Sequence, residues 1–248
     1  MLYTASISEK ENAGVGKEQI MRYLILVVTI LLIAAVPVLG ASSFLGGFSG
    51  NIYTPDGIIV PEKTLELSYH DTLKLFGNTD VSALSGVYGF GTNLEAGISF
   101  LHNSDSDAVI SAKYRVINET ADSPAVLVGV FDLAGTANWI NDNPGFFIVL
   151  SKNITSFASE VTNQPSKPLR LSIGAGSGIF NNLFAGFDWT IERNLSLMAE
   201  INGGRIADQT NIVNAGLRWA AIPDLRVDAA YVGFKQFAFG ANYRIAFR

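Results

Sequence analysis

Glu66, Ser68 and His70 stand two residues apart on one predicted strand and carry the side-chain types of a hydrolase triad. An acid, a nucleophile and a base on one wall are what a lipid-modifying enzyme needs. Residues i and i+2 of a strand stand about 7 Å apart, however, which exceeds the hydrogen-bond distance that a triad requires. The spacing therefore favours three lining side chains, and we predict that the protein is not an enzyme.

Two other clusters suggest ligand or ion binding. His102, Asp105 and Asp107 share a loop tip, but a tip rich in Asn, Ser and Asp is typical of a solvated loop. The glycine-rich run 174–178 is similar to a phosphate-binding loop, yet it ends a strand with no following helix and no Lys. We therefore predict neither a metal nor a cofactor.

The composition limits the class of protein. The 248 residues are 48% hydrophobic and 16% charged, which is enough to bury the core of a single domain. With 24 glycines and 11% aromatic residues, the chain favours short strands and tight turns over helices. The net charge of -5 comes without a basic stripe, so nucleic acid is excluded as a partner. No cysteine is present, which excludes disulfides, thiolate metal sites and a lipoprotein anchor.

The first forty residues are interpreted as an N-terminal extension and a signal peptide. Arg22 precedes the uncharged run 23–39, and small residues follow, so we expect cleavage near Gly40 or Ser42. A retained single-pass helix is the alternative, because the run approaches the roughly 20 residues that span a bilayer. The polar residues before Met21 leave open whether translation starts there or at Met1.

From residue 64 onward, large apolar side chains alternate with small or polar ones, which is the signature of strands. Twelve segments show the pattern: 64–72, 81–90, 94–101, 109–117, 125–133, 146–152, 169–176, 183–191, 195–202, 213–219, 225–231 and 236–247. They predict an all-β fold over 64–248, a single antiparallel up-and-down transmembrane β-barrel of about twelve strands, with ten to fourteen possible.

The connections between these segments predict the orientation of the barrel. An even number of strands returns both chain ends to the periplasm, where turns are expected to be short. The connections 102–108, 134–145 and 203–210 fall on the longer, outer side. The connection 153–168 is long where a short turn is expected, so either it hides a strand or one of the twelve segments is wrong.

On each predicted strand one face is apolar, and the other carries small residues and charges of both signs. The charged face decides between a membrane barrel and a soluble barrel. An Arg or Lys that faces lipid at the membrane midplane costs about 2–4 kcal/mol, so these side chains belong inside a wet lumen. The predicted lumen-lining residues are Glu66, Ser68, His70, Glu95, Lys113, Arg115, Asp132, Arg170, Asp188, Glu200, Arg218, Arg226, Asp228 and Arg244. The predicted lipid-facing residues are Phe187, Trp189, Leu217, Trp219, Tyr231, Phe237, Phe239, Tyr243 and Phe247.

A family resemblance is carried by residues 47–69. This segment reads GFSGNIYTPDGIIVPEKTLELSY and is similar to the N-terminal segment of YjbH-like outer-membrane proteins, with Gly50, Ile52, Thr54, Pro55, Pro61, Leu65 and Tyr69 in common. The resemblance covers about a tenth of the chain. It implies an outer-membrane barrel that is linked to exopolysaccharide production, and it assigns no functional residue.

Together these patterns predict three regions: the leader over 1–40, a periplasmic segment over 41–63 and the barrel over 64–248. The predicted function is that of a narrow passive pore or a structural scaffold in the bacterial outer membrane. Its expected partners are outer-membrane lipid and either polysaccharide or small solutes. The alternative is a soluble periplasmic or secreted β-barrel that binds a small ligand, because alternation alone also fits an apolar interior.

Overall fold

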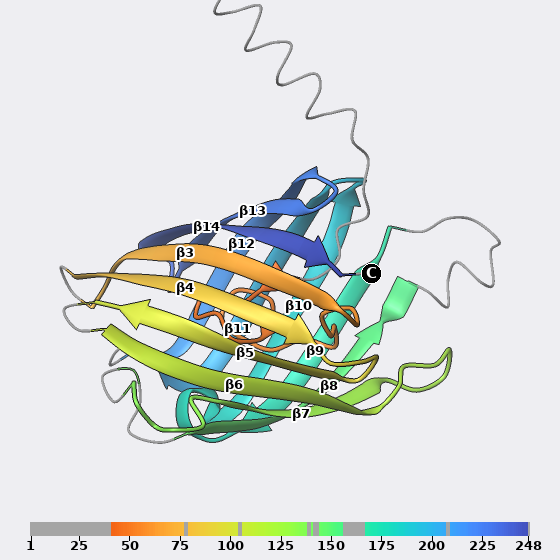
Figure 1. Cartoon of the computed structure of the whole chain (residues 1–248), viewed down its shortest axis with the longest axis horizontal. Helices are drawn as coiled ribbons and strands as arrows, with labels where there is room; N and C mark the ends of the chain where they lie inside the picture. The colour runs from red at the N-terminus through yellow and green to blue at the C-terminus, as the bar shows by residue number, and fades with distance from the viewer. Residues whose placement is uncertain are drawn as a thin grey trace, which may run out of the picture.

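The computed structural model describes residues 41–76, 79–103, 106–137, 140, 144–155, 167–206 and 209–247. Twelve antiparallel strands close into one barrel (Figure 1), which confirms the predicted fold class and strand number. They are β3 (Thr64–Phe76), β4 (Thr79–Gly89), β5 (Leu94–His102), β6 (Ser106–Ile117), β7 (Ala125–Phe131), β8 (Gly145–Asn153), β9 (Leu169–Gly176), β10 (Asn182–Glu192), β11 (Leu195–Ile206), β12 (Gln209–Ile222), β13 (Leu225–Val232) and β14 (Gln236–Ala246). Among the described residues, no helix is long and apolar enough to cross a membrane.

Each strand pairs with its neighbour in sequence, and the seam closes where β14 pairs with β3. Side chains alternate between the two sides of the wall, as the period of two predicts. On β13, for example, Arg226 and Asp228 are buried whereas Val227 and Tyr231 are exposed. The polar stripe therefore lies inside the barrel and the apolar stripe outside.

The connections differ from the prediction in two ways. β8 pairs directly with β9, so no strand lies between these two in the wall, and residues 156–166 of the connection lie outside the described part of the chain. The expectation of long outer loops over 102–108 and 203–210 is wrong, because β6, β11 and β12 extend into them. Polar side chains weaken the alternation at strand ends, while the backbone ladder continues past them.

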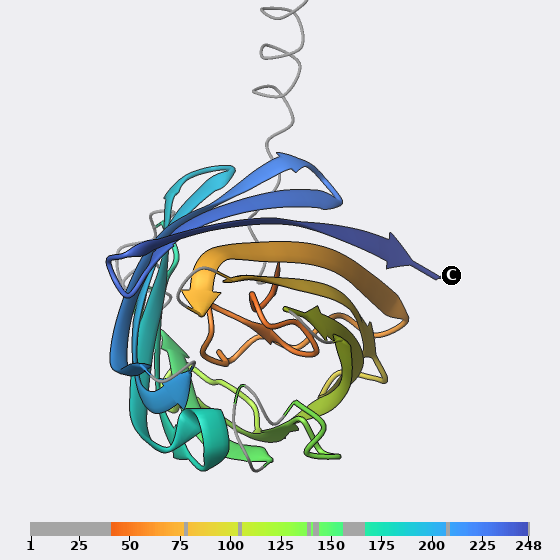
Figure 2. The same ribbon diagram turned by 90° about the vertical axis from the view of Figure 1, so that its left-hand side faces the viewer.

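Residues 41–60 lie inside the barrel (Figure 2), and the exposed residues 61–63 connect them to β3. Residues 41–60, called the plug from here on, are buried with the single exception of Ile58, which is partly exposed. Within the plug, β1 (Ala41–Ser42) pairs with β2 (Ser49–Gly50) in a small sheet. This position differs from the expectation that 41–63 form a separate periplasmic segment. The predicted signal peptide, residues 1–40, lies outside the described residues.

Candidate functional site inside the barrel

The charged residues of the inner wall surround the plug. Of the residues predicted to line the lumen, the structure buries Glu66, Ser68, His70, Glu95, Lys113, Asp132, Glu200, Arg218, Arg226, Asp228 and Arg244 and leaves Arg115, Arg170 and Asp188 partly exposed. Asp132 is not on a strand. It follows β7 with a φ of 55° and accepts hydrogen bonds from Thr136 and Ala137, so it shapes a loop. The others lie on strands of the barrel.

Two wall glutamates hold the ends of the plug. Glu66 Oε1 accepts hydrogen bonds from the backbone N and the Oγ of Ser42, at 2.5 and 2.8 Å. Its other oxygen accepts one from Arg244 Nε at 2.6 Å. Glu95 accepts hydrogen bonds from the backbone N of Ser49 and of Val60, at 2.7 and 2.6 Å. Because charge-assisted bonds are about twice as strong as neutral ones, these carboxylates fix the plug to β3 and β5.

Glu200 on β11 holds the middle of the plug. Its carboxylate accepts hydrogen bonds from three consecutive backbone N–H groups, those of Ile52, Tyr53 and Thr54, at 3.1, 2.7 and 3.0 Å. It also accepts bonds from Thr54 Oγ1 at 2.7 Å and from Asn214 Nδ2 at 2.8 Å. This carboxylate therefore satisfies backbone donors that would otherwise be buried without an acceptor.

Cations on the wall add further bonds to carbonyl oxygens of the plug, and Lys113 and Arg218 are the most buried of them. Lys113 Nζ donates to the carbonyl oxygen of Ser49 at 2.6 Å and lies 3.4 Å from a carboxylate oxygen of Asp56. Arg218 donates to the carbonyl oxygens of Gly50 and Asn51, both at 3.2 Å. Donors on the wall thus meet acceptors of the plug, and acceptors on the wall meet its donors.

Arg218 also forms an ion pair within the wall. Its Nε donates to Asp228 Oδ1 at 2.9 Å, and both side chains are fully buried. Asp228 Oδ2 accepts a further bond from Asn242 Nδ2 at 2.9 Å and lies 3.5 Å from His70 Nε2. A buried charge is tolerated only when it is paired and hydrogen-bonded, and this network meets both conditions for Asp228.

The half of the interior farther from the chain ends is apolar. Inward side chains there include Leu75 at the end of β3, Leu101 at the end of β5 and Val232 at the end of β13. They belong to one buried cluster with Phe48 and Ile52 of the plug. The expectation of a wet lumen therefore does not hold in this half, where a packed core takes the place of water.

Aromatic side chains and a short 3₁₀ helix fill the far mouth of the barrel. The helix η1 (Gly178–Phe180) follows β9 and places Phe180 inside. The ring of Phe180 lies 6.0 Å from that of Phe48, 5.0 Å from that of Phe147 and 5.7 Å from that of Phe184, centroid to centroid. Such separations are typical of favourable aromatic pairs. The plug is thus joined to the outer end of the wall by apolar contacts.

The turn of the plug at Gly47 packs closely against a small residue of the wall. Gly47 has a φ of 78°, and a Cβ atom there would lie 2.8 Å from the Oγ of Ser111. Gly135 has a similar φ of 64°, but among the described residues a Cβ atom there would meet only Pro144 Cδ, at 3.9 Å. The two glycines therefore separate the cost of backbone strain from the cost of crowding.

We predict that Gly47→Ala lowers the free energy of unfolding by about 2–4 kcal/mol, because it adds a steric clash to an unfavourable φ. Gly135→Ala is the matched control and is expected to cost about 1 kcal/mol from backbone strain alone. Urea unfolding in detergent micelles measures both variants. Equal losses at the two positions would contradict a tightly packed turn at Gly47.

Burial also changes the acidity of the plug's tyrosine. Tyr53 Oη and Thr72 Oγ1 share a hydrogen bond of 2.9 Å. Burial raises the pKa of the Tyr53 phenol above its usual range, and the Glu200 carboxylate raises it further, although the bond to Thr72 acts in the opposite direction. Tyr53 therefore stays protonated, and it tethers the plug to β3.

The candidate triad does not assemble. Glu66 pairs with Arg244, Ser68 Oγ lies 2.5 Å from Ser85 Oγ, and His70 faces Asp228. Each side chain thus has partners on other strands and none within the set. In the candidate metal cluster, Asp105 lies outside the described residues, and His102 Nδ1 is 2.8 Å from Ser106 Oγ. Within the described part of the chain, no three His, Cys, Asp or Glu side chains are placed to hold an ion.

The outer wall is apolar. Of the residues predicted to face lipid, Trp189, Leu217, Tyr231, Phe237, Phe239, Tyr243 and Phe247 are between 41% and 51% exposed, and Phe187 and Trp219 are partly exposed. A closed barrel with a greasy exterior and charges enclosed inside is stable in a bilayer, because it leaves no backbone edge unpaired. The protein is a bacterial outer-membrane β-barrel.

Comparison with known proteins gives fold likeness only. No family model matches the chain, and no curated protein matches it. Among solved structures, the KdgM porin is 10% identical with a TM-score of 0.49, covering 75% of this chain and 99% of its own. The NanC porin is 12% identical with a TM-score of 0.49, covering 73% and 100%. The Acinetobacter baumannii outer membrane protein Omp33 is 10% identical with a TM-score of 0.47, covering 75% and 99%.

Proposed function

We propose that this outer-membrane barrel is a closed structural scaffold and that it does not conduct in the state described. The observation that carries the proposal is the plug, which is buried and bonded to charged side chains on β3, β5, β6, β11 and β12. A passive pore needs a continuous hydrated path, whereas this interior is packed with side chains from both the plug and the wall.

The proposal extends to surface polysaccharide. The segment that is similar to YjbH-like proteins, residues 47–69, consists of most of the plug and the beginning of β3. Because the similar residues include much of the plug, the resemblance supports the proposal that this chain and YjbH-like proteins close their barrels in the same way. On that resemblance, we propose that the protein serves exopolysaccharide production as a scaffold. Loss of the protein should then lower the amount of surface polysaccharide, while the release of small solutes stays unchanged.

Conductance in planar lipid bilayers tests the scaffold directly. We expect the purified full-length protein to be folded, as judged by a heat-modifiable band on a gel. After insertion into the bilayer it should remain electrically silent. Steady single-channel currents from the folded band would overturn the proposal and favour a passive pore for small solutes.

A thiol-labelling experiment tests the same point in intact membranes, since the natural chain has no cysteine. Ser111 faces the plug, is fully buried and has no hydrogen-bond partner for its Oγ among the described residues. We expect Ser111→Cys to react with a polar maleimide on the order of 100-fold more slowly than Thr92→Cys, which lies in an exposed turn. Equal labelling rates would mean that water and solutes pass along the interior.

A further inference from the structure

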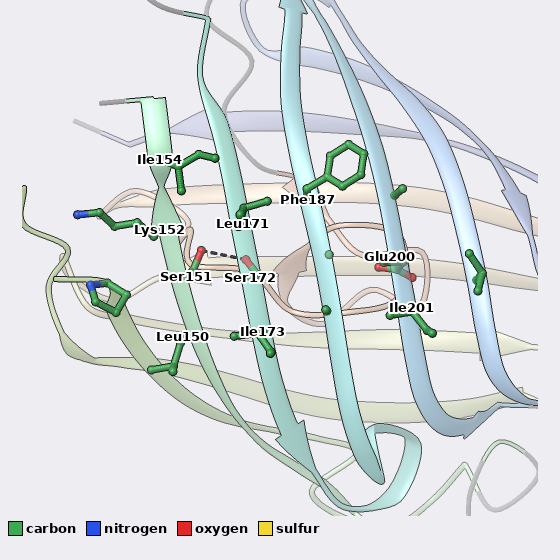
Figure 3. Close-up of a pocket in the computed structure, with 15 residues that line it drawn as sticks. Leu150, Ser151, Lys152, Ile154, Leu171, Ser172, Ile173, Phe187, Glu200 and Ile201 are labelled. Carbon is green, nitrogen blue, oxygen red and sulfur yellow. Dashed lines mark hydrogen bonds between the residues drawn. The ribbon is translucent and has the colours of Figure 1, made fainter. Parts of the chain in front are cut away.

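An apolar groove runs over the outside of β8 to β12 (Figure 3). It has a volume of about 770 Å³, within the roughly 300–1,000 Å³ that is typical of small-molecule sites. One side is formed by Leu150 and Ile173, on β8 and β9, and the other by Ile201 and Val213, on β11 and β12. These side chains point away from the barrel interior, so the groove lies on the surface that the bilayer covers.

The floor of the groove is low because β10 and β11 carry small residues there. Ala185 is paired with Ile173 on one side and Ile201 on the other, so a methyl group lies between two large side chains. Ala199 takes the corresponding place on β11, opposite Phe187. A second hollow of about 670 Å³ shares Ile173, Ala185 and Ile201 and continues the groove toward the far end of the barrel.

A cation marks the end of the groove that is nearer to the chain ends. Lys152 lines the groove, and its ammonium group donates to the carbonyl oxygens of Thr120, Ala121 and Ser123. The three carbonyl oxygens use all three N–H bonds of the ammonium and direct it toward the loop, while its positive charge remains because the carbonyl groups are neutral. Because both chain ends of an even-stranded barrel lie on the periplasmic side, Lys152 lies at the depth of the inner-leaflet headgroups.

We propose that this groove binds one phospholipid of the periplasmic leaflet. One acyl chain lies on the floor formed by Ala185 and Ala199, and the positive charge of Lys152 attracts the headgroup phosphate without donating a hydrogen bond to it. A second copy of the barrel fits less well, because a convex wall would rest on the ridges and leave the floor empty, whereas a flexible acyl chain reaches it. This site goes beyond the proposed scaffold function and does not depend on whether the barrel conducts.

Native mass spectrometry of the folded protein, extracted in a mild detergent, tests the proposal. We expect roughly one phospholipid retained per wild-type barrel, and occupancy lowered about fivefold or more in the double variant Ala185→Leu and Ala199→Leu, which fills the groove. Ala229→Leu is the matched control, because Ala229 faces outward on β13 beyond the groove, and it should retain the lipid. Lys152→Gln should lower the retention of anionic phospholipid more than that of zwitterionic phospholipid.

Each contrary result is decisive for the site. Equal lipid retention in the filled variant and the control would overturn it, as would a wild-type barrel that carries no phospholipid in native membranes. A cross-linked dimer that is lost only in the filled variant would assign the groove to a second copy. The heat-modifiable band shift reports folding for every variant, and a conducting barrel that retains its lipid would overturn only the scaffold proposal.

Discussion

Glu200→Ala is expected to lower the free energy of unfolding by about 3–5 kcal/mol. The substitution removes the acceptor of three backbone N–H groups of the plug and of the Thr54 hydroxyl, and all of these donors belong to buried residues. Leaving a buried donor without a partner costs about 1–3 kcal/mol per group, and relaxation of the plug recovers part of the sum. Urea unfolding followed by tryptophan fluorescence measures the loss.

The control for Glu200 is a glutamate of the same wall that lies in water. Glu192 is paired with Lys167, but the two side chains are 68% and 55% exposed, so Glu192→Ala should cost less than about 1 kcal/mol. Glu200→Gln keeps the shape and one acceptor oxygen, and its loss should fall between the two alanine variants. If Glu200→Ala were no worse than Glu192→Ala, the plug would not be held by this carboxylate.

The second large effect is expected at Arg218. Arg218→Met should destabilise the barrel by about 3–5 kcal/mol, because Asp228 then remains buried without its counter-charge and two plug carbonyls lose their donor. The same urea unfolding experiment measures it. The double variant Arg218→Met and Asp228→Leu removes both charges and should regain at least about 1 kcal/mol relative to Arg218→Met.

The single variant Asp228→Leu completes this cycle. It leaves Arg218 buried with only the carbonyl oxygens of Gly50 and Asn51, so it should also be less stable than the wild type. Additive losses in the double variant would contradict a direct pairing of the two charges. A protein that keeps its stability in Arg218→Met would show that the plug is held by apolar packing alone.

The alternation of side chains was enough to predict the barrel and the strands that form it. On β14, large apolar residues such as Phe237, Phe239 and Tyr243 alternate with small or polar ones, and the structure places the two sets on opposite sides of the wall. β7 carries apolar residues at successive positions, such as Val126, Leu127 and Val128, of which only Leu127 is fully buried. Where both faces are apolar, periodicity cannot tell which one faces inward, and the packed outer half of the interior was missed for this reason.

The plug could not be predicted from local pattern. Residues 41–63 have no sustained period, and their contacts join positions far apart in the chain, such as Asn51 with Arg218 and Tyr53 with Glu200. One usable signal was present. The inner faces of the predicted strands carry many small residues, such as Ser85, Ser99 and Ser111, which leave space that a narrow barrel must fill with something else.

The position of the plug ahead of the twelve wall strands sets an order on folding. β3 follows the plug and forms the seam with β14, so the cylinder is sealed only when β14 has been added. Inserting the plug into a cylinder that is already sealed would be slow, because its backbone would have to find Glu66, Glu95 and Glu200 inside a closed wall. The simplest route is therefore for the strands to assemble around the plug one after another, with β14 added last to close the barrel against β3.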